Sequence, residues 1–516
     1  MGLIEKSDEI SSRKIIIMIY LDQNIDLYNN DIRVMLQAFF DNEKVVLEEE
    51  GTRIALKAEF TYDTDVEVPV LQKGGYVTFT LTDEKGYEAG STIVIDFMNK
   101  KLARNPIKGK LYGMLSEYTG KELPWGSLTG VRPTKIATEC LEQGKSEEEI
   151  KRLYKDVYLT TEQKADICLE VARKEQELFA GFDYDNEYCI YIGIPFCPTR
   201  CLYCSFTSYP ISAYMTDVDG YLRALYREMD AVSSNEIYRN KRLVAIYMGG
   251  GTPSALTAGE LRALIEHLKA SFDMSYVREF CVECGRPDSI TEDKLNTLKK
   301  LEVERISINP QTMWDDTLKL IGRAHTVEQT RAAFKLAREC GFDNINMDII
   351  VGLPGEELSH VEHTLSEIEK MAPDSLTVHS LAIKRAANLN IEMDRYHSLI
   401  KGSTNEMLMA VDSCARRLGL APYYLYRQKN IPGKLENIGY AASGKECLYN
   451  VLIMEEKLDI IAMGAGASSK FIFREEGRIE RVENVKNVDQ YIDRIDEMID
   501  RKQRMFRVLS ESKQLK

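Results

Sequence analysis

Residues 191–204 read Tyr-Ile-Gly-Ile-Pro-Phe-Cys-Pro-Thr-Arg-Cys-Leu-Tyr-Cys. Three cysteines, Cys197, Cys201 and Cys204, therefore stand on one short stretch with the spacing C-x3-C-x2-C. Iron–sulfur cubes are normally held by four cysteine thiolates. Three thiolates would hold such a cube and leave one iron without a protein ligand. The stretch therefore predicts a [4Fe–4S] cluster with an open coordination position.

A structural zinc site, or three cysteines that only pack in the interior, are the alternative interpretations. Structural zinc takes four Cys or His ligands, and no further Cys or His follows close to this stretch. The spacing resembles the signature of the radical S-adenosylmethionine (SAM) enzymes. In those enzymes SAM occupies the open iron, and an electron passed through the cluster splits SAM into methionine and a 5′-deoxyadenosyl radical. The resemblance implies a [4Fe–4S] cluster and SAM as cofactors.

The composition is that of a globular protein, with 516 residues, 44% hydrophobic and 29% charged. This length predicts roughly three or four domains. A net charge of −14 argues against a general nucleic-acid or anionic-membrane binder. No run approaches the ~18 apolar residues of a membrane span. The start of the chain does not resemble a secretory signal, and the 11 cysteines form no disulfide framework, so we expect a cytoplasmic protein.

The pattern of expected strands and helices along the chain predicts four segments. Residues 1–118 mix strand-like runs with helices and predict an N-terminal α+β domain, with strands at 14–20, 53–60 and 76–81. Residues 119–186 predict a helical connector, in which a capping box opens a helix at Ser146. Residues 187–385 predict a core of repeated strand, loop and helix. Residues 386–516 predict a mixed C-terminal domain that ends in an amphipathic helix near 488–502.

The core segment predicts an α/β fold whose sheet curls into a barrel or part of one, and the resemblance to radical SAM enzymes implies a partial (β/α)6 TIM-like barrel. Six apolar runs are expected as its strands: 189–194, 244–248, 279–283, 305–308, 344–350 and 375–381. Capping boxes at Thr257 and Thr326 predict helices between them. Strands that alternate with helices favour a parallel sheet, and crossovers of one hand curl it toward a barrel. The chemistry of such folds lies at the carboxyl ends of the strands.

Several residues that suit SAM binding fall at these expected strand ends. Gly249–Gly251, followed by Thr252, offers exposed backbone with no Cβ in the way. Glu283, Gln311 and Asp348 are each expected to close a later strand, which points their polar groups at one opening. Arg323 is a candidate for bidentate pairing with a carboxylate. Taken singly, a residue of each of these types is more often a surface or capping residue. The evidence for a SAM site is therefore their expected convergence at the ends of successive strands.

The segment from about 187 to 470 resembles the oxygen-independent coproporphyrinogen III dehydrogenase family. The resemblance rests on Ile-Pro-Phe-Cys, Gly-Gly-Gly-Thr-Pro-Ser, Glu-Cys-Gly-Arg-Pro-Asp, Arg-Ile-Ser-Ile-Asn-Pro-Gln, Ile-Gly-Arg-Ala-His, Asn-Met-Asp-Ile-Ile-Val-Gly-Leu-Pro-Gly and Gly-Ala-Gly-Ala. The longer N-terminal part, with Leu-Thr-Gly-Val-Arg-Pro-Thr-Lys, resembles the HemZ branch. By this resemblance, the three cysteines ligate iron and Tyr191 lies near the reactive opening. The implied SAM contacts are Gly250, Thr252, Glu283, Gln311, Arg323 and Asp348, with Tyr203, Ile350 and the backbone of Ala382 around adenine.

The family reaction takes hydrogen from a propionate of the porphyrinogen and releases CO2, which leaves a vinyl group. The resemblance thus implies a tetrapyrrole substrate and a flavodoxin or ferredoxin-type electron donor. Two positions depart from the family: Gly193 stands where it has a histidine, and Phe206 where it has a further cysteine.

Three functions remain open. The first is oxidative decarboxylation of coproporphyrinogen III, the second is radical methylation or ring opening of a haem-like tetrapyrrole, and the third is a haem carrier as in the HemW branch. Two smaller questions also stay open. Cys281 and Cys284 resemble a redox pair, but residues three apart on a strand face opposite sides. His379 is expected either to face the site or to be a core histidine.

Overall fold

The computed structural model describes residues 18–40, 44–49, 52–62, 74–96, 100–384, 386–400, 402–428 and 435–514. The chain divides into two compact units, one of residues 1–130 and 145–166 and the other of residues 131–144 and 167–516. The finer division into four domains at residues 118, 186 and 385 remains a prediction.

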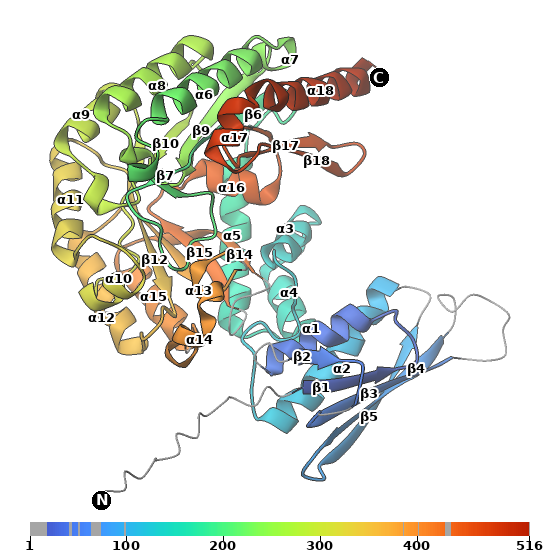
Figure 1. Ribbon diagram of the computed structural model, residues 1–516. Coiled ribbons are helices and arrows are strands. Elements are labelled where there is room, and N and C mark those ends of the chain that lie inside the picture. The colour runs from blue at the N-terminus through green and yellow to red at the C-terminus, as the bar shows by residue number, and fades with distance from the viewer. Residues whose placement is uncertain are drawn as a thin grey trace, which may run out of the picture. The chain divides into compact units, whose positions relative to one another are not determined.

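The first unit is an α+β sandwich built on a five-stranded sheet in the order β2-β1-β3-β4-β5 (Figure 1). Alternate side chains of β4, namely Val77, Phe79 and Leu81, are buried, which is the pattern of a sheet covered on one face. The first half of the strand predicted at 14–20 lies outside the described residues. The elements are β1 (Met18–Gln23), α1 (Asn29–Phe39), β2 (Lys44–Val46), β3 (Ile54–Tyr62), β4 (Gly74–Asp83), β5 (Glu88–Asp96), α2 (Lys100–Thr119), α4 (Glu147–Arg152) and a π-helical turn (Leu153–Val157).

The second unit is built on six adjacent parallel strands that follow one another in chain order. They are β6 (Glu187–Ile194), β9 (Arg242–Gly250), β10 (Glu279–Glu283), β11 (Arg305–Ser307), β12 (Ile345–Val351) and β13 (Ser375–Ser380). Their burial is almost continuous, as in strands covered on both faces. Each predicted strand is found within two residues of its expected bounds, and the partial barrel is confirmed.

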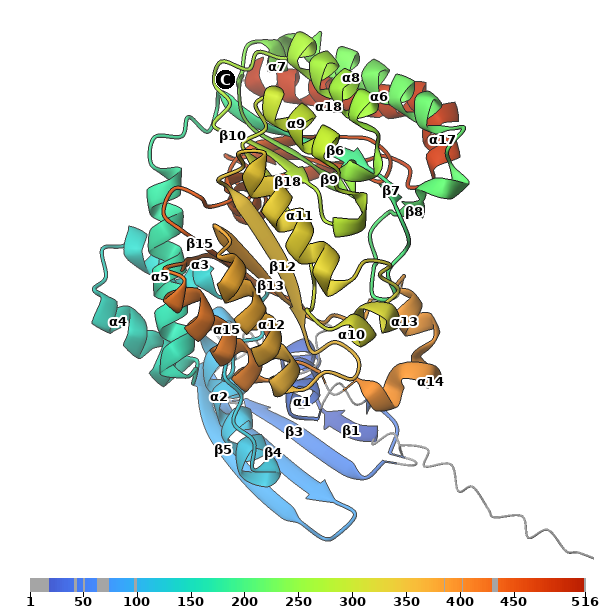
Figure 2. The same cartoon turned by 90° about the vertical axis from the view of Figure 1, so that its left-hand side faces the viewer.

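Helices connect these strands and cover the outer face of the sheet (Figures 1 and 2). The capping boxes predicted at Thr257 and Thr326 are present, and each hydroxyl accepts from the backbone N–H three residues on. The box at Ser146 in the first unit is also present. The connecting helices are α6 (Val218–Ser233), α7 (Glu236–Arg239), α8 (Ala258–Ser271), α9 (Glu292–Lys300), α10 (Asp315–Leu320), α11 (Val327–Glu339) and α12 (Leu358–Met371); α3 (Thr134–Glu142) and α5 (Glu162–Phe179) precede β6.

The C-terminal part extends the same sheet at both ends. Strand β15 (Glu436–Ala441) pairs antiparallel with β13, and β14 (Ala421–Arg427) pairs with β15. At the other end, β16 (Asp459–Met463) lies parallel to β6, followed by the hairpin of β17 (Ser468–Phe473) and β18 (Arg478–Glu483). The helices here are α13 (Asn388–Ile391), α14 (Met393–Tyr396), α15 (Asn405–Arg417), α16 (Leu448–Glu455), α17 (Val488–Asp493) and α18 (Ile495–Gln514).

The single helix predicted near 488–502 is wrong. The chain forms α17 and α18 instead, because the helical backbone is interrupted at Arg494 (φ −111°, ψ 24°). Helix α18 then packs on α6 through a fully buried ion pair. Lys502 Nζ donates to Glu228 Oε1 at 2.6 Å and to Asn484 Oδ1 at 2.8 Å.

The same carboxylate organises the turn after β16. Glu228 Oε2 accepts from the backbone N–H of Gly464 at 2.9 Å, and Tyr221 Oη donates to the carbonyl of Gly193. The backbone N–H of Ala465 donates to Tyr221 Oη at 3.1 Å. This network joins the C-terminal helix to the end of β6. No helix in the described parts of the chain has the length and apolar character that a membrane crossing needs.

Candidate active site

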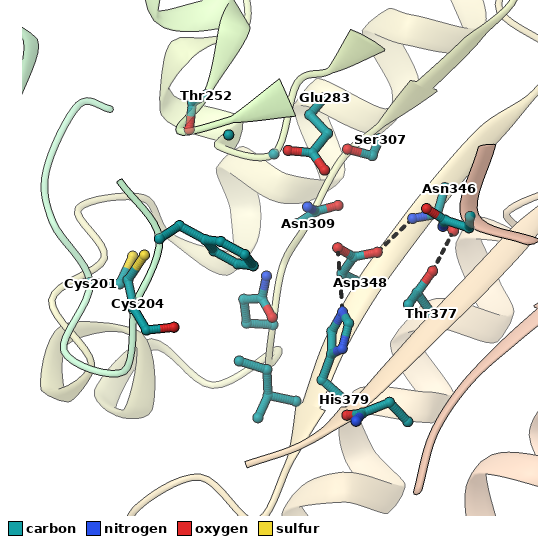
Figure 3. Close-up of a pocket in the computed structure, with 18 of the residues that line it drawn as sticks. Cys201, Cys204, Thr252, Glu283, Ser307, Asn309, Asn346, Asp348, Thr377 and His379 are labelled. Carbon is teal, nitrogen blue, oxygen red and sulfur yellow. Dashed lines mark hydrogen bonds and ion pairs between the residues drawn. The ribbon is translucent and has the colours of Figure 1, made fainter. Parts of the chain in front are cut away.

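A cavity of about 460 Å³ lies in the second unit, where the ends of the parallel strands meet the cysteine loop, residues 197–204 (Figure 3). It brings together all the residues that the family resemblance assigns to the cluster, to SAM or to the reactive opening. These are Tyr191, Cys197, Cys201, Tyr203, Cys204, Gly250, Thr252, Glu283, Gln311, Arg323, Asp348, Ile350 and Ala382. Their roles as ligands stay predictions, but the convergence on which those predictions depend is present.

The cysteine loop is anchored by its backbone at several points. The short strand β7 (Phe196–Cys197) pairs with β8 (Tyr209–Pro210), and the N–H of Leu202 donates to the carbonyl of Ile321 at 2.9 Å. Cys201 is 8% exposed, and Cys197 and Cys204 are half-buried. All three are free thiols. The loop therefore presents three thiols to one cavity from a fixed backbone.

The glycine run at the end of β9 lies against the start of that loop. The N–H groups of Gly251 and Thr252 donate to the carbonyls of Ile194 and Phe196, each at 2.7 Å. A Cβ on Gly251 would lie 2.6 Å from the Phe196 oxygen, so no side chain fits there. Gly250 has φ +106°, a conformation that favours glycine. The run therefore brings backbone to the cavity wall where a side chain would block it.

Acidic and amide groups line the opposite wall (Figure 3). Asn346 Nδ2 donates to Asp348 Oδ1 at 2.6 Å, and His379 Nε2 lies 3.9 Å from Asp348 Oδ2. Burial raises the pKa of Glu283 to about 7, against the lowering effect of the hydrogen bond from Tyr247 Oη. His379 thus lines the cavity, so of the two expectations for this residue the structure supports the one in which it faces the site.

Two expectations about strand ends need correction. Asp348 does not close a strand, because β12 continues to Val351. Gln311 lies beyond the end of β11, in a loop where its φ is +68°, and is held by bridging to Ile349. Glu283 is the last residue of β10, as expected. The three side chains nevertheless line the same cavity, because the chain after β11 continues parallel to β12, where the N–H of Gln311 donates to the carbonyl of Asp348 at 2.9 Å.

Buried polar atoms without partners mark this cavity as a site for a polar ligand. Among the described residues, Gln311 Oε1, Asn309 Oδ1, Ser307 Oγ and Arg323 Nε are buried and have no hydrogen-bond partner. Arg323 Nη1 donates to the carbonyls of Asn309 and Gly285, which fixes its guanidinium in the wall. Leaving such groups unpaired is costly, so a ligand with several polar atoms fits here.

The remaining candidates form the aromatic and apolar parts of the wall. Tyr191 stacks with Tyr247 and Tyr449, with ring centroids 6.2 and 6.1 Å apart. Burial raises the pKa of Tyr191 above its usual value. Tyr203, Ile350 and Ala382 lie on the side of the cysteine loop and the ends of β12 and β13. Such groups suit contact with the flat face of a base.

Some lining residues were missed by sequence reasoning: Arg286, Ser307, Asn309, Asn346, Thr377 and Lys384. Asn346 had a signal, because it is two residues before Asp348 and so shares its face of the strand. Cys281, on β10, also lines the cavity, whereas Cys284, the residue after β10, does not. Lys384 carried no comparable signal, because it lies in a loop after β13.

The donor set fits a cluster with SAM on its open iron. Three thiols supply iron ligands, the glycine run supplies exposed backbone, and the unpartnered polar atoms supply groups for an amine, a carboxylate and hydroxyls. Within the described ranges, no three His, Cys, Asp or Glu side chains converge as a single metal ion requires. A cube of four irons is wider than one ion, so its thiolates are spread around it.

Comparisons with known proteins agree with this chemistry. Residues 191–368 match the model of the radical SAM superfamily. The chain is 42% identical over 404 residues to the oxygen-independent coproporphyrinogen-III oxidase-like protein HemZ of Bacillus subtilis, covering 78% of this chain and 81% of that protein. It is 34% identical to the heme chaperone HemW of the same organism, over 60% of this chain and 76% of that one. The solved structure of coproporphyrinogen III oxidase (HemN) from Escherichia coli covers 63% of this chain and 72% of its own, with 21% identity and a TM-score of 0.48.

Proposed function

This chain belongs to the radical SAM superfamily, in its oxygen-independent coproporphyrinogen III oxidase-like branch, and from that premise we propose that it oxidatively decarboxylates coproporphyrinogen III. Two propionates would become vinyl groups, giving protoporphyrinogen IX in anaerobic haem synthesis. Its cofactors are a [4Fe–4S] cluster and SAM, which together supply a radical able to take hydrogen from an unactivated C–H bond.

The observation that carries the proposal is the complete site. The three cysteines, Gly250, Gly251 and the polar wall line one cavity, which supports their proposed role in binding the cofactors. Arg323 and the acidic residues would hold the methionine and ribose ends of SAM, and Tyr203 and Ile350 would cover adenine. The protein's part in the reaction is to fix the reacting carbons and to exclude water.

Two residues beside the cysteine loop suit a flat ring that carries carboxylates. Phe206 lines the cavity and is 66% exposed, so its ring is at the opening. Lys384 Nζ lies 5.5 Å from the centre of that ring. Burial lowers the pKa of Lys384, and within the described chain no acidic side chain pairs with it. A propionate on a tetrapyrrole would supply that missing negative charge.

The test is anaerobic incubation of reconstituted protein with SAM, a strong reductant and coproporphyrinogen III. Release of 5′-deoxyadenosine together with CO2 and vinyl products is expected. Lys384→Gln should keep uncoupled SAM cleavage and raise the KM for the porphyrinogen about tenfold, since a charge-assisted hydrogen bond is lost. Deoxyadenosine with a methylated or opened ring, and no CO2, would refute the decarboxylation.

A haem carrier is the second candidate, favoured by Phe206 and by the HemW relative. An exposed aromatic ring at the cavity opening would stack on a bound macrocycle. Stoichiometric haem binding without turnover in the same assay would support this candidate. For either function we propose a cytoplasmic location, and for the decarboxylation a flavodoxin or ferredoxin-type electron donor.

A further inference from the structure

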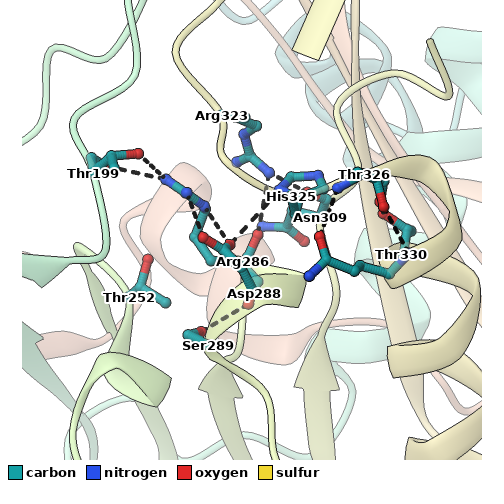
Figure 4. A network of polar contacts seen from close by, with 12 residues as sticks. Thr199, Thr252, Arg286, Asp288, Ser289, Asn309, Arg323, His325, Thr326 and Thr330 are labelled. Carbon is teal, nitrogen blue, oxygen red and sulfur yellow. Dashed lines mark hydrogen bonds and ion pairs between the residues drawn. The ribbon is translucent and has the colours of Figure 1, made fainter. Parts of the chain in front are cut away.

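A buried arginine, Arg286, contacts the cysteine loop at Thr199 (Figure 4). Arg286 follows β10 by three residues and is 2% exposed. Its Nη1 donates to the carbonyl of Thr199 at 3.1 Å and to its hydroxyl at 3.0 Å. The same nitrogen lies 3.9 Å from the sulfur of Cys201. One edge of the guanidinium is therefore turned toward a predicted iron ligand and the backbone beside it.

The other edge of the guanidinium is clamped by a carboxylate. Arg286 Nε and Nη2 donate to the two oxygens of Asp288 at 2.9 and 2.8 Å, a bidentate pair. His325 Nδ1 lies 3.7 Å from Asp288 Oδ1, and the imidazole is fully buried. This arrangement leaves Arg286 little freedom to turn away from the loop.

We propose that Arg286 is a positioning residue that fixes the cysteine loop and raises the reduction potential of the cluster held there. Reduction adds a negative charge to the cluster. A guanidinium that donates toward a ligand sulfur stabilises that charge, and hydrogen bonds to the sulfurs are among the factors that set cluster potentials. Asp288 has the opposite effect, because its carboxylate partly cancels the positive charge of Arg286. The proposal rests on the cluster and holds whichever tetrapyrrole reaction follows.

The competing interpretation is a brace with no electrostatic effect. Substitutions that remove charges of opposite sign distinguish the electrostatic role from the purely structural one. Arg286→Gln removes a positive charge near the cluster, and Asp288→Asn removes a negative charge, while Asn keeps an oxygen that accepts from the arginine. An electrostatic role predicts that the two substitutions shift the reduction potential of the cluster in opposite directions. A purely structural brace predicts no shift in either variant, or the same disorder of the cysteine loop in both.

The experiment is an anaerobic redox titration of reconstituted protein without SAM, followed by electron paramagnetic resonance of the reduced cluster. For Arg286→Gln we expect the ratio of reduced to oxidised cluster at a fixed potential to fall about tenfold, which for a one-electron couple is about 59 mV. For Asp288→Asn we expect the ratio to rise. The reduction potential of Arg286→Lys should lie between those of Arg286→Gln and the parent, because lysine keeps the positive charge but lacks the bidentate geometry of the guanidinium.

Arg331→Gln is the matched control, since this arginine pairs with Glu328 and Glu367 on the outer helices α11 and α12. Its potential should match that of the parent. Iron and sulfide content report on loading separately from potential. If Arg286→Gln does not hold iron, Asp288→Asn decides the matter: an unchanged or lower potential overturns the proposal. Shifts of the reduction potential in the same direction in Arg286→Gln and Asp288→Asn would also overturn the proposal. Failure to turn over coproporphyrinogen does not affect it.

Discussion

Cys201 is the most enclosed of the three loop thiols and is predicted to be an iron ligand. Cys201→Ala should lose the cluster, because two thiolates do not hold a cube. Iron content and the visible absorption of anaerobically reconstituted protein measure this. Cys284→Ala is the control, since Cys284 is also buried (1% exposed) but does not line the cavity. A full [4Fe–4S] spectrum from Cys201→Ala would contradict the ligand assignment.

Glu283 predicts a pH-dependent affinity for SAM. Its carboxyl is protonated below a pKa of about 7 and ionised above it. An ionised carboxylate accepts charge-assisted hydrogen bonds, so affinity should rise severalfold from pH 6 to pH 8. Glu283→Gln should remove this part of the slope. Calorimetric titration of both proteins gives the difference, in which the titration of SAM itself cancels. Equal slopes would rule out a role for this carboxyl.

The site residues that sequence reasoning found share one physical basis. Cys197, Glu283 and Thr252 lie at or just beyond the ends of parallel strands, and such ends meet at one edge of a sheet. Arg286 was missed because its role depends on Thr199 and Cys201, which are distant in sequence. Contacts of that kind depend on tertiary packing and leave no periodic signal in the chain.

At the scale of elements, the end of β9 is packed too closely to accept a side chain. Gly251→Ala would place a Cβ 2.6 Å from the Phe196 oxygen and 2.8 Å from the Ile194 oxygen. We expect a loss of about 1–3 kcal/mol in the free energy of unfolding, and a lower iron content, because β9 must move away from the cysteine loop. Urea unfolding and iron analysis measure the two effects.

Gly259→Ala is the matched control for that change. Gly259 lies in the first turn of α8, and a Cβ there meets nothing within 4 Å. Alanine favours a helix over glycine by up to ~1 kcal/mol, so this variant should be slightly more stable. If both substitutions had the same effect, close packing at the strand end would not be the cause.

The six barrel strands were predictable because each is a short apolar run between turn residues. The capping boxes at Ser146, Thr257 and Thr326 were equally clear, since they depend on hydrogen bonds three residues apart. The break at Arg494 was not predictable, because apolar residues continue on both sides of it. There the packing of α18 on α6 decides the path of the chain.

At the scale of the whole second unit, the C-terminal helix is held by the buried pair of Lys502 and Glu228. Lys502→Met would leave the carboxylate buried and unpaired, which costs about 3–5 kcal/mol. Arg504→Met, two residues on, removes an exposed pair with Asp500 and should change stability by less than about 0.5 kcal/mol. Urea unfolding of the cluster-free protein compares them. Similar losses in both variants would show that the buried pair is not special.

The pairing of β16 with β6 illustrates what local sequence does not reveal. Asp459–Met463 is an apolar run like any other strand, and nothing in it specifies Tyr188–Ile192 as its partner. That partner is set by the buried network around Glu228 and by the turn at Gly464. Long-range register is therefore a property of the folded molecule.

This pairing also has a consequence for biosynthesis. Translation reaches Asp459 on the order of tens of seconds after Tyr188, at ~5–20 residues per second. After β9 has been made and until Asp459–Met463 follows, the nascent chain carries the cysteine loop next to a strand that lacks one of its two neighbours. Cluster insertion is thus expected only after Asp459–Met463 has been synthesised and has paired with β6.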